Sequence, residues 1–322
     1  MQNPNKRKYG GTGWRHGAYV LTAAVLCLVV APACGPAASS GEEDGRLRVT
    51  ATTGMVADAA RNVGGDHVAV TGLMGPGVDP HMYRPSQSTL RKLEEADLIL
   101  YNGLMLEGGM GQVLDRMARR RPMAAVAEAV PRERLMQPAE YEGAYDPHVW
   151  FDVSLWMHAV EAVRDALIEL DPDNEADYRA NTEAYLAELE ELDAYVREQI
   201  ASIPDEQRVL VTAHDAFGYF GRAYDIEVLA LQGISTAAEF GLQDITRLAR
   251  EIARREIKAV FLETTIAPRS IQALLEGVRD LGHDVEIGGD LYSDAMGPEG
   301  SPEGAYTGMV RHNVDTIVRA LR

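Results

Sequence analysis

The sequence predicts an α/β protein with two lobes, each a parallel sheet flanked by helices, joined by one long rigid connecting helix. Three observations support this class. Short, nearly continuous apolar runs alternate with helical segments, the alternation occurs twice, and a glycine-free helical stretch separates the two occurrences. The 322 residues are also enough for two cores of ordinary size.

The expected strands are short and rich in β-branched and apolar residues. They lie at 47–52, 67–72, 97–101, 208–213, 226–230, 258–263 and 284–288. Helical patterns separate them at 55–63, 86–96, 242–256 and 268–281. Because strands of this kind are buried on both faces, we expect parallel sheets covered by helices.

The connecting helix is expected between Asp173 and Ile203, where apolar residues recur at helical spacing. These residues are Tyr178, Tyr185, Leu189, Leu192 and Val196. About 30 residues at a rise of about 1.5 Å give a helix on the order of 45 Å long. Two shorter helices broken near Asn181, or a solvent-facing interaction helix, are the alternatives. The apolar stripe favours packing along the lobes.

Residues 1–33 have the composition of a secretory signal peptide. A basic head without acidic residues precedes an apolar run from Ala18 to Ala33, which is short for a bilayer span. A single transmembrane anchor is the alternative. The prediction places the mature chain outside the cytoplasm.

Cys34 follows the small residue Ala33 and resembles the lipidated cysteine of bacterial lipoproteins. Residues 34–46 are then a lipid-anchored flexible tether, on the outer face of the cell membrane or in a periplasm. Simple secretion, with cleavage near Ala33, is the alternative. The remaining chain divides into an N-terminal lobe at 47–171, the connector at 172–204 and a C-terminal lobe at 205–322.

The chain is acidic, with 49 Asp and Glu against 31 Lys and Arg and a net charge of −18. Such a surface argues against nucleic acid as a partner and suits a protein that collects cations. After cleavage the only cysteine left is at the membrane, so a metal in the folded part must be bound by histidine and carboxylate.

Three of the eight histidines share a context that predicts metal binding. His81 and His148 each follow an Asp-Pro pair, and His214 directly follows the strand at 208–213. Asp290 takes the matching place after the strand at 284–288. Ligands of open α/β sheets bind at the carboxyl ends of strands, so two facing lobes would bring these four residues together between them.

Imidazole and carboxylate suit zinc, manganese and iron. Three His and one Asp leave a divalent ion with a residual charge of about +1, which hydrogen bonds from the imidazoles to nearby carboxylates would help to balance. The candidates for that supporting role are Asp79, Asp146, Asp215 and Glu263. His67 and His283 are expected at the surface, and His158 and His312 on helices in structural roles.

Several long motifs resemble the metal-binding lipoprotein family of ABC transporters, the manganese/zinc solute-binding group. They are DPHMYRPSQSTLRKLEEADLILYNGLMLEG, DPHVWFDVSLW, TAHDAFGYFGRAYDI, QGISTAAEFGLQDI and GGDLYSDAMGPEGSPEGAYTGMVRHNVDTI. The resemblance spans residues 47–322. It implies two lobes, one long helix, and an interlobe metal held by His81, His148, His214 and Asp290.

The function that this resemblance implies is capture of one divalent ion, Zn²⁺ or Mn²⁺, as cargo for the membrane permease of an ABC importer. We expect a monomer that is not an enzyme. A surface adhesin-type lipoprotein with a structural metal is one alternative. A secreted zinc hydrolase is another, although no HExxH motif is present. Residues 103–146 lack the histidines typical of zinc-dedicated members, and members that favour manganese often have Glu in place of His214, so the metal stays open.

Overall fold

Parallel sheets covered by helices form the computed structural model, which describes residues 45–138, 141, 143–238 and 240–322. The expected signal peptide and Cys34 lie outside the described residues. Within the described part of the chain, none of the helices combines the length and hydropathy that a bilayer crossing requires.

The N-terminal lobe is built on a four-stranded sheet of order β2-β1-β3-β4, in which all neighbours are parallel. Its strands are β1 (Leu47–Ala51), β2 (Val68–Gly72), β3 (Leu98–Tyr101) and β4 (Met123–Ala125). Its helices are α1 (Gly54–Gly64), α2 (Gln87–Glu95), α3 (Gly111–Met117) and α4 (Val153–Leu170).

The C-terminal lobe contains two parallel strand pairs, with β5 lying beside β7. The strands are β5 (Val209–His214), β6 (Glu227–Gln232), β7 (Ala259–Glu263) and β8 (Glu286–Leu291). The helices are α6 (Gly218–Tyr224), α7 (Leu242–Arg255), α8 (Arg269–Asp280) and α9 (Tyr306–Leu321). Strand β8 ends at Leu291, beyond the end of the strand expected at 284–288. The loop that follows the strand therefore begins later in the sequence than expected.

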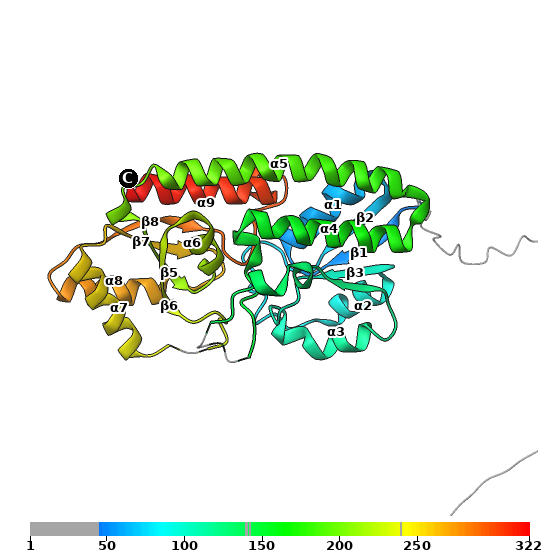
Figure 1. The fold of residues 1–322 in the computed structure, drawn as a ribbon. Coiled ribbons are helices and arrows are strands. Elements are labelled where there is room, and N and C mark those ends of the chain that lie inside the picture. The colour runs from blue at the N-terminus through cyan, green and yellow to red at the C-terminus, as the bar shows by residue number, and fades with distance from the viewer. Residues whose placement is uncertain (1–44, 139–140, 142, 239) are drawn as a thin grey trace, which may run out of the picture. The chain divides into compact units, whose positions relative to one another are not determined.

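Helix α5 (Glu175–Ala201) connects the lobes without a break at Asn181, which confirms the single long helix. Acidic residues in its first turn favour the helix N-terminus, and Pro204 follows its end at Ala201, where a proline cannot continue a helix. All five predicted apolar positions on α5 are buried. They pack on α1 and α4 in one lobe and on α9 in the other (Figure 1).

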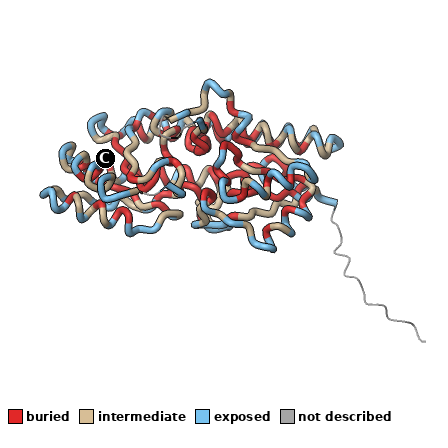
Figure 2. Tube along the Cα trace, turned by 90° about the horizontal axis from the view of Figure 1, so that it is seen from below, coloured by how far each residue is buried: buried red, intermediate tan, exposed pale blue. Residues whose placement is uncertain are grey.

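The hydrophobic core continues from one lobe to the other. A single cluster of buried residues includes Val49 of β1, Leu189 of α5, Phe261 of β7 and Tyr306 of α9. Buried positions accordingly run through the interior of both lobes (Figure 2). A shared apolar core of this kind resists separation of the lobes, because opening it would expose apolar surface to water.

Candidate metal centre

His81 and His148 reach the site through two loops of the same local design. In each Asp-Pro-His sequence the aspartate accepts a hydrogen bond from the backbone N–H of the histidine two residues later. Asp79 Oδ1 accepts from His81 at 2.9 Å, and Asp146 Oδ1 accepts from His148 at 3.0 Å. The intervening proline fixes its own backbone angle φ. The aspartate hydrogen bond and the proline ring together therefore set the direction in which each histidine side chain points.

The C-terminal lobe supplies the other two side chains. His214 is the last residue of β5, and Asp294 lies three residues beyond the end of β8. Ser293, the neighbour of Asp294, is fully buried, and its carbonyl accepts a hydrogen bond from the Trp150 indole at 3.1 Å. This bond ties the Asp294 segment to the segment that carries His148.

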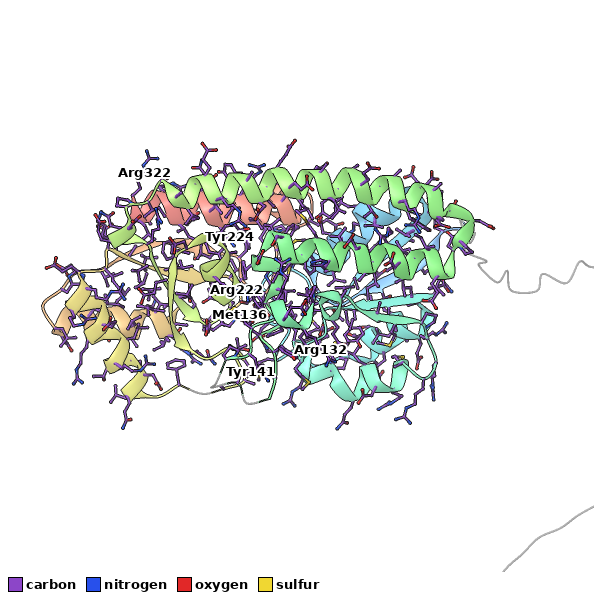
Figure 3. All side chains as sticks on the ribbon, viewed as in Figure 1. Arg132, Met136, Tyr141, Arg222, Tyr224 and Arg322 are labelled. Carbon is purple, nitrogen blue, oxygen red and sulfur yellow. The ribbon has the colours of Figure 1, made fainter. Side chains whose placement is uncertain are left out.

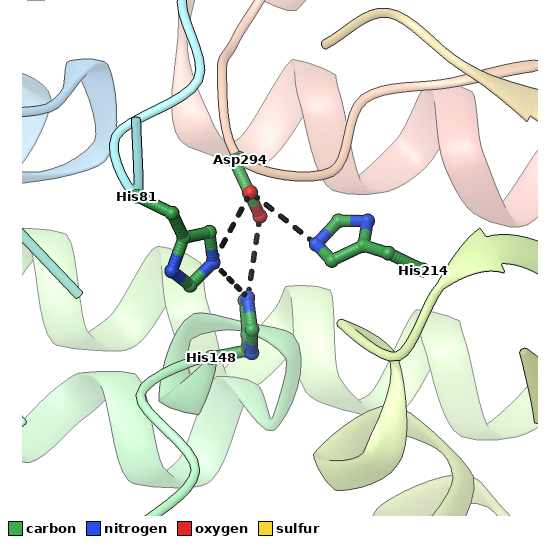
Figure 4. A group of neighbouring side chains, drawn as sticks. All are labelled: His81, His148, His214 and Asp294. Atoms are coloured by element: carbon green, nitrogen blue, oxygen red, sulfur yellow. Dashed lines mark hydrogen bonds and ion pairs between the residues drawn. The ribbon is translucent and has the colours of Figure 1, made fainter. Parts of the chain in front are cut away.

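These four side chains converge on one point (Figure 4). Each offers one ligand atom, and the four atoms all lie within 4.8 Å of one another. Asp294 Oδ2 is 3.6 Å from Nε2 of His81 and 3.3 Å from Nε2 of His214, and Oδ1 is 3.4 Å from Nε2 of His148. Ligand atoms around a tetrahedral zinc with bonds of about 2.0–2.1 Å lie about 3.3 Å apart, so these separations fit an ion at the centre.

Burial and missing partners also point to an ion. His81 and Asp294 are at most 5% exposed, and His148 and His214 are fully buried. Among the described residues, Nε2 of His214 and both carboxylate oxygens of Asp294 have no hydrogen-bond partner. Buried polar atoms without partners are costly, and a coordinated cation would satisfy all three.

The two histidines of the N-terminal lobe differ in their electrostatics. Burial lowers the pKa of His81 to about 3, against the opposing charge of Asp294. Burial also acts against a proton on His148, but its hydrogen bond to Asp146, together with the charges of Asp146 and Asp294, raises its pKa to about 9. His81 is therefore ready to coordinate at neutral pH, whereas His148 holds a proton that a metal must displace.

The C-terminal pair behaves as an ion pair. Burial works against a proton on His214, but the charges of Glu263 and Asp294 outweigh it and raise its pKa well above the ordinary value. Burial would raise the pKa of Asp294, yet the charge on His214 and the nearby imidazole of His148 hold it well below its usual range. A metal ion must therefore displace a proton from His214 before it can bind beside the ionised Asp294.

Two carboxylates orient the rings from behind. Asp146 Oδ1 is 2.8 Å from Nδ1 of His148, and Glu263 Oε2 is 2.5 Å from Nδ1 of His214. Glu263 also accepts the backbone N–H groups of Ala213 and His214, so it bridges β7 and β5. Such contacts leave Nε2 free to face a metal and make the imidazole a stronger ligand.

The other two carboxylates expected in a supporting role act differently. Asp79 contacts the backbone of His81 and the hydroxyl of Thr236, not the His81 ring. Asp215 is the residue after His214, and its backbone N–H donates to the carbonyl of Gln232 at 3.1 Å.

The structure corrects one predicted ligand: Asp294, not Asp290, belongs to the cluster. Asp290 lies inside β8, opposite Leu262 of β7, and is exposed. Its carbonyl accepts a hydrogen bond from His312 at 3.1 Å. The error follows from the boundary of β8. A strand that ended at residue 288 would place Asp290 in the loop after it, whereas β8 continues to Leu291. The rule that ligands follow strand ends, applied to the true end at Leu291, selects Asp294.

The other expected histidine positions lie away from the cluster. His158 is on α4, 3.6 Å from Glu161, and His67 pairs with Asp177 at 2.8 Å. His283 contacts the carbonyl of Ile257 at 3.0 Å. None of these side chains belongs to the candidate cluster.

Sequence reasoning missed three side chains that hold the site from outside: Trp150, Tyr219 and Thr236. The Tyr219 hydroxyl accepts from the backbone of Met136 and donates to the carbonyl of Asp146. Met136, labelled in Figure 3, lies in the loop before His148, so its hydrogen bond with Tyr219 of α6 joins that loop to the C-terminal lobe. No motif marks these contacts, since each depends on pairing between distant segments.

Fold and cluster together define a two-lobed α/β protein with a buried candidate site for a divalent metal ion. The chain belongs to the family of zinc-uptake complex component A, periplasmic, whose model matches residues 49–320. This family consists of solute-binding transport proteins and not of enzymes.

Similar proteins are named for different metals. The chain is 48% identical to manganese-binding lipoprotein MntA of Bacillus subtilis strain 168, over 94% of this chain and 99% of the relative. It is 49% identical to zinc-binding protein TroA of Treponema pallidum, over 86% of this chain and 90% of the relative. The solved structure of periplasmic zinc-binding protein TroA superposes with a TM-score of 0.84, covering 86% of this chain and 99% of that one.

Proposed function

We propose that this chain captures one divalent transition-metal ion, manganese or zinc, outside the cytoplasm and delivers it to the permease of an ABC importer. The observation that carries the proposal is the buried cluster of three imidazoles and one carboxylate, in which Nε2 of His214 and both oxygens of Asp294 have no hydrogen-bond partner among the described residues. An ion at their centre would satisfy these atoms and offset the buried carboxylate charge.

The ligand set suits cargo better than catalysis. A catalytic zinc keeps a position open for water beside three protein ligands, whereas four protein side chains surround this centre. All four are buried, which suits an ion enclosed by protein side chains better than a solvent-accessible catalytic metal. The family's transport role agrees with this reading.

The proposal includes the arrangement expected from the sequence. Residues 47–171 and 205–322 act as the two lobes, and 172–204 forms the connector. Cys34 carries the lipid that holds a monomeric binding protein at the membrane. The relatives named as lipoproteins support this anchoring.

Either metal is compatible with the site. Imidazole nitrogen favours zinc, and zinc binds more tightly than manganese to nearly any such set in the Irving–Williams order. The two carboxylate oxygens of Asp294 both face the centre, which would also allow the higher coordination number that manganese prefers. The delivered metal is then set by supply and by the permease.

The test is equilibrium titration with Zn²⁺ and Mn²⁺, followed by elemental analysis, on the purified protein and on two histidine variants. His148→Ala should abolish tight binding. His158→Ala is a matched control, because His158 lies in the same lobe and outside the cluster. We expect one ion per chain in wild type and His158→Ala. Absence of stoichiometric metal in wild type, or equal binding by His148→Ala, would refute the proposal.

A further inference from the structure

The ring of His81 is supported less firmly than the rings of the other two histidines. Nδ1 of His148 and Nδ1 of His214 each contact a buried carboxylate. Among the described residues, no carboxylate or carbonyl oxygen is hydrogen-bonded to the corresponding nitrogen of His81, and the polar contacts of its ring are to His148 and Asp294 of the cluster. The position of His81 therefore depends on its loop.

That loop is partly exposed: Pro80 and His81 are buried and Val78 and Asp79 half-buried, but the residues around them reach solvent. Gly75, Pro76 and Gly77 are exposed before His81, and Met82 is 49% exposed directly after it. By contrast, Val149, Trp150 and Phe151, which follow His148, are buried. A partly exposed loop opens at lower free energy than a fully buried segment.

One hydrogen bond fixes this loop to the C-terminal lobe. The hydroxyl of Thr236 donates to Asp79 Oδ2 at 2.6 Å, and Asp79 Oδ1 accepts the backbone N–H of His81 at 2.9 Å. Within the described residues, it is the sole hydrogen bond that links residues 75–85 to residues 205–322. The acceptor, Asp79, is a carboxylate, which makes this hydrogen bond stronger than one between two neutral groups.

Thr236 is itself held in place from the metal-binding strand. Gln232 ends β6 and is paired in register with His214 at the end of β5. The side-chain amide of Gln232 donates to the carbonyl of Thr236 at 2.7 Å and to that of Ala238 at 2.5 Å. A chain of contacts thus runs from the strand of one candidate ligand, through Gln232, Thr236 and Asp79, to the loop of another.

We propose that Thr236 is a positioning residue, whose hydroxyl holds Asp79 and thereby keeps His81 in the coordination sphere of the cargo ion. This inference rests on the proposed function and adds to it the step that limits metal release. Three candidate ligands are fixed in buried scaffold, so the ion leaves when the His81 loop separates from Thr236.

The test is the rate at which Zn²⁺ passes from the loaded protein to an excess of a chromophoric chelator, followed by stopped flow. Thr236→Val keeps the side-chain shape and removes the hydroxyl. We expect it to release zinc roughly tenfold to a hundredfold faster, the range for loss of a hydrogen bond to a charged group. Thr236→Ser retains the hydroxyl and should restore a rate near that of wild type.

Two controls separate this role from a general weakening of the loop. Ser235→Ala removes a neighbouring hydroxyl whose contact is with Ala237 of the same loop, and should leave the rate within about twofold. In an Asp79→Ala background, Thr236→Val should have no further effect, because its partner is already gone. Thermal unfolding of the metal-free variants should differ little, since the proposed effect is on zinc retention.

The outcomes are distinct. Equal release rates for wild type and Thr236→Val, with one zinc bound to each, would overturn the positioning role and leave the proposed function standing. Acceleration shared by Ser235→Ala, or persisting in the Asp79→Ala background, would also overturn it. Failure of the wild-type protein to bind zinc would overturn the proposed function and this role together.

Discussion

Replacing Asp294 by asparagine is the most informative change at the candidate site. The substitution keeps the shape of the side chain and one oxygen ligand but removes the only negative charge among the four ligands. Breaking a buried charge interaction by removing one partner costs about 3–5 kcal/mol. At about 1.4 kcal/mol per factor of ten, metal affinity should fall roughly a hundredfold to a few thousandfold.

The matched control is Asp290→Asn, four residues earlier in the same polypeptide segment. Asp290 is exposed and lies inside β8, so its loss should change affinity by no more than about twofold. Competition titration with a chelator of known zinc affinity measures both. Wild-type affinity in Asp294→Asn, or an equal loss in Asp290→Asn, would refute the assignment of the carboxylate ligand.

Further predictions concern protons, supporting carboxylates and the connecting helix. Because the pKa of His148 is raised to about 9 and that of His214 is raised as well, the metal-free site holds protons on both rings that zinc must displace. Zinc affinity should therefore fall by at least about tenfold per pH unit, or at least about a hundredfold between about pH 8 and pH 6. Competition titrations showing constant affinity would contradict this. Asp146→Asn and Glu263→Gln should each weaken zinc binding about 10- to 100-fold in the same assay, since each carboxylate orients a ligand ring, and unchanged affinity would argue against that role. Leu189→Ala, at a fully buried position on α5, should lower the free energy of unfolding by about 2–5 kcal/mol in chemical denaturation. The control Glu190→Ala, at an exposed position, should change it little. Equal effects of the two substitutions would argue against burial of this face of α5.

The fold was largely predictable because its elements obey local rules. Helix α5 was expected from Asp173 to Ile203 and is observed from Glu175 to Ala201, since an apolar stripe and the absence of glycine both favour one helix. The strand at 284–288 was less well placed. Its residues include Gly288 and Gly289, which have weak strand preference, and only pairing with β7 extends β8 to Leu291.

The candidate site was predictable to the extent that it follows from topology. His81 and His148 lie in loops and His214 lies at a strand end. These are the positions at which parallel α/β sheets bind their ligands. The prediction of Asp290 as the carboxylate ligand was wrong because it depended on the boundary of one strand, β8. Thr236 left no signal, because its hydrogen bond to Asp79 joins residues 157 positions apart.

Metal affinity and metal release depend on different parts of the structure. The cluster is buried, and two of its rings are held by carboxylates within the shared interior of the protein. The continuous core makes wide separation of the lobes costly, because it would expose apolar surface. The release that we propose moves only the partly exposed loop of His81 and leaves this core intact.

The most direct test of the account is a crystal structure of the zinc-loaded protein with anomalous diffraction measured at the zinc edge. We predict one strong peak per chain, about 2.0–2.2 Å from Nε2 of His81, His148 and His214 and from a carboxylate oxygen of Asp294. A peak elsewhere, or none at this cluster in protein shown to contain stoichiometric zinc, would contradict the central claim that these four side chains hold the transported ion.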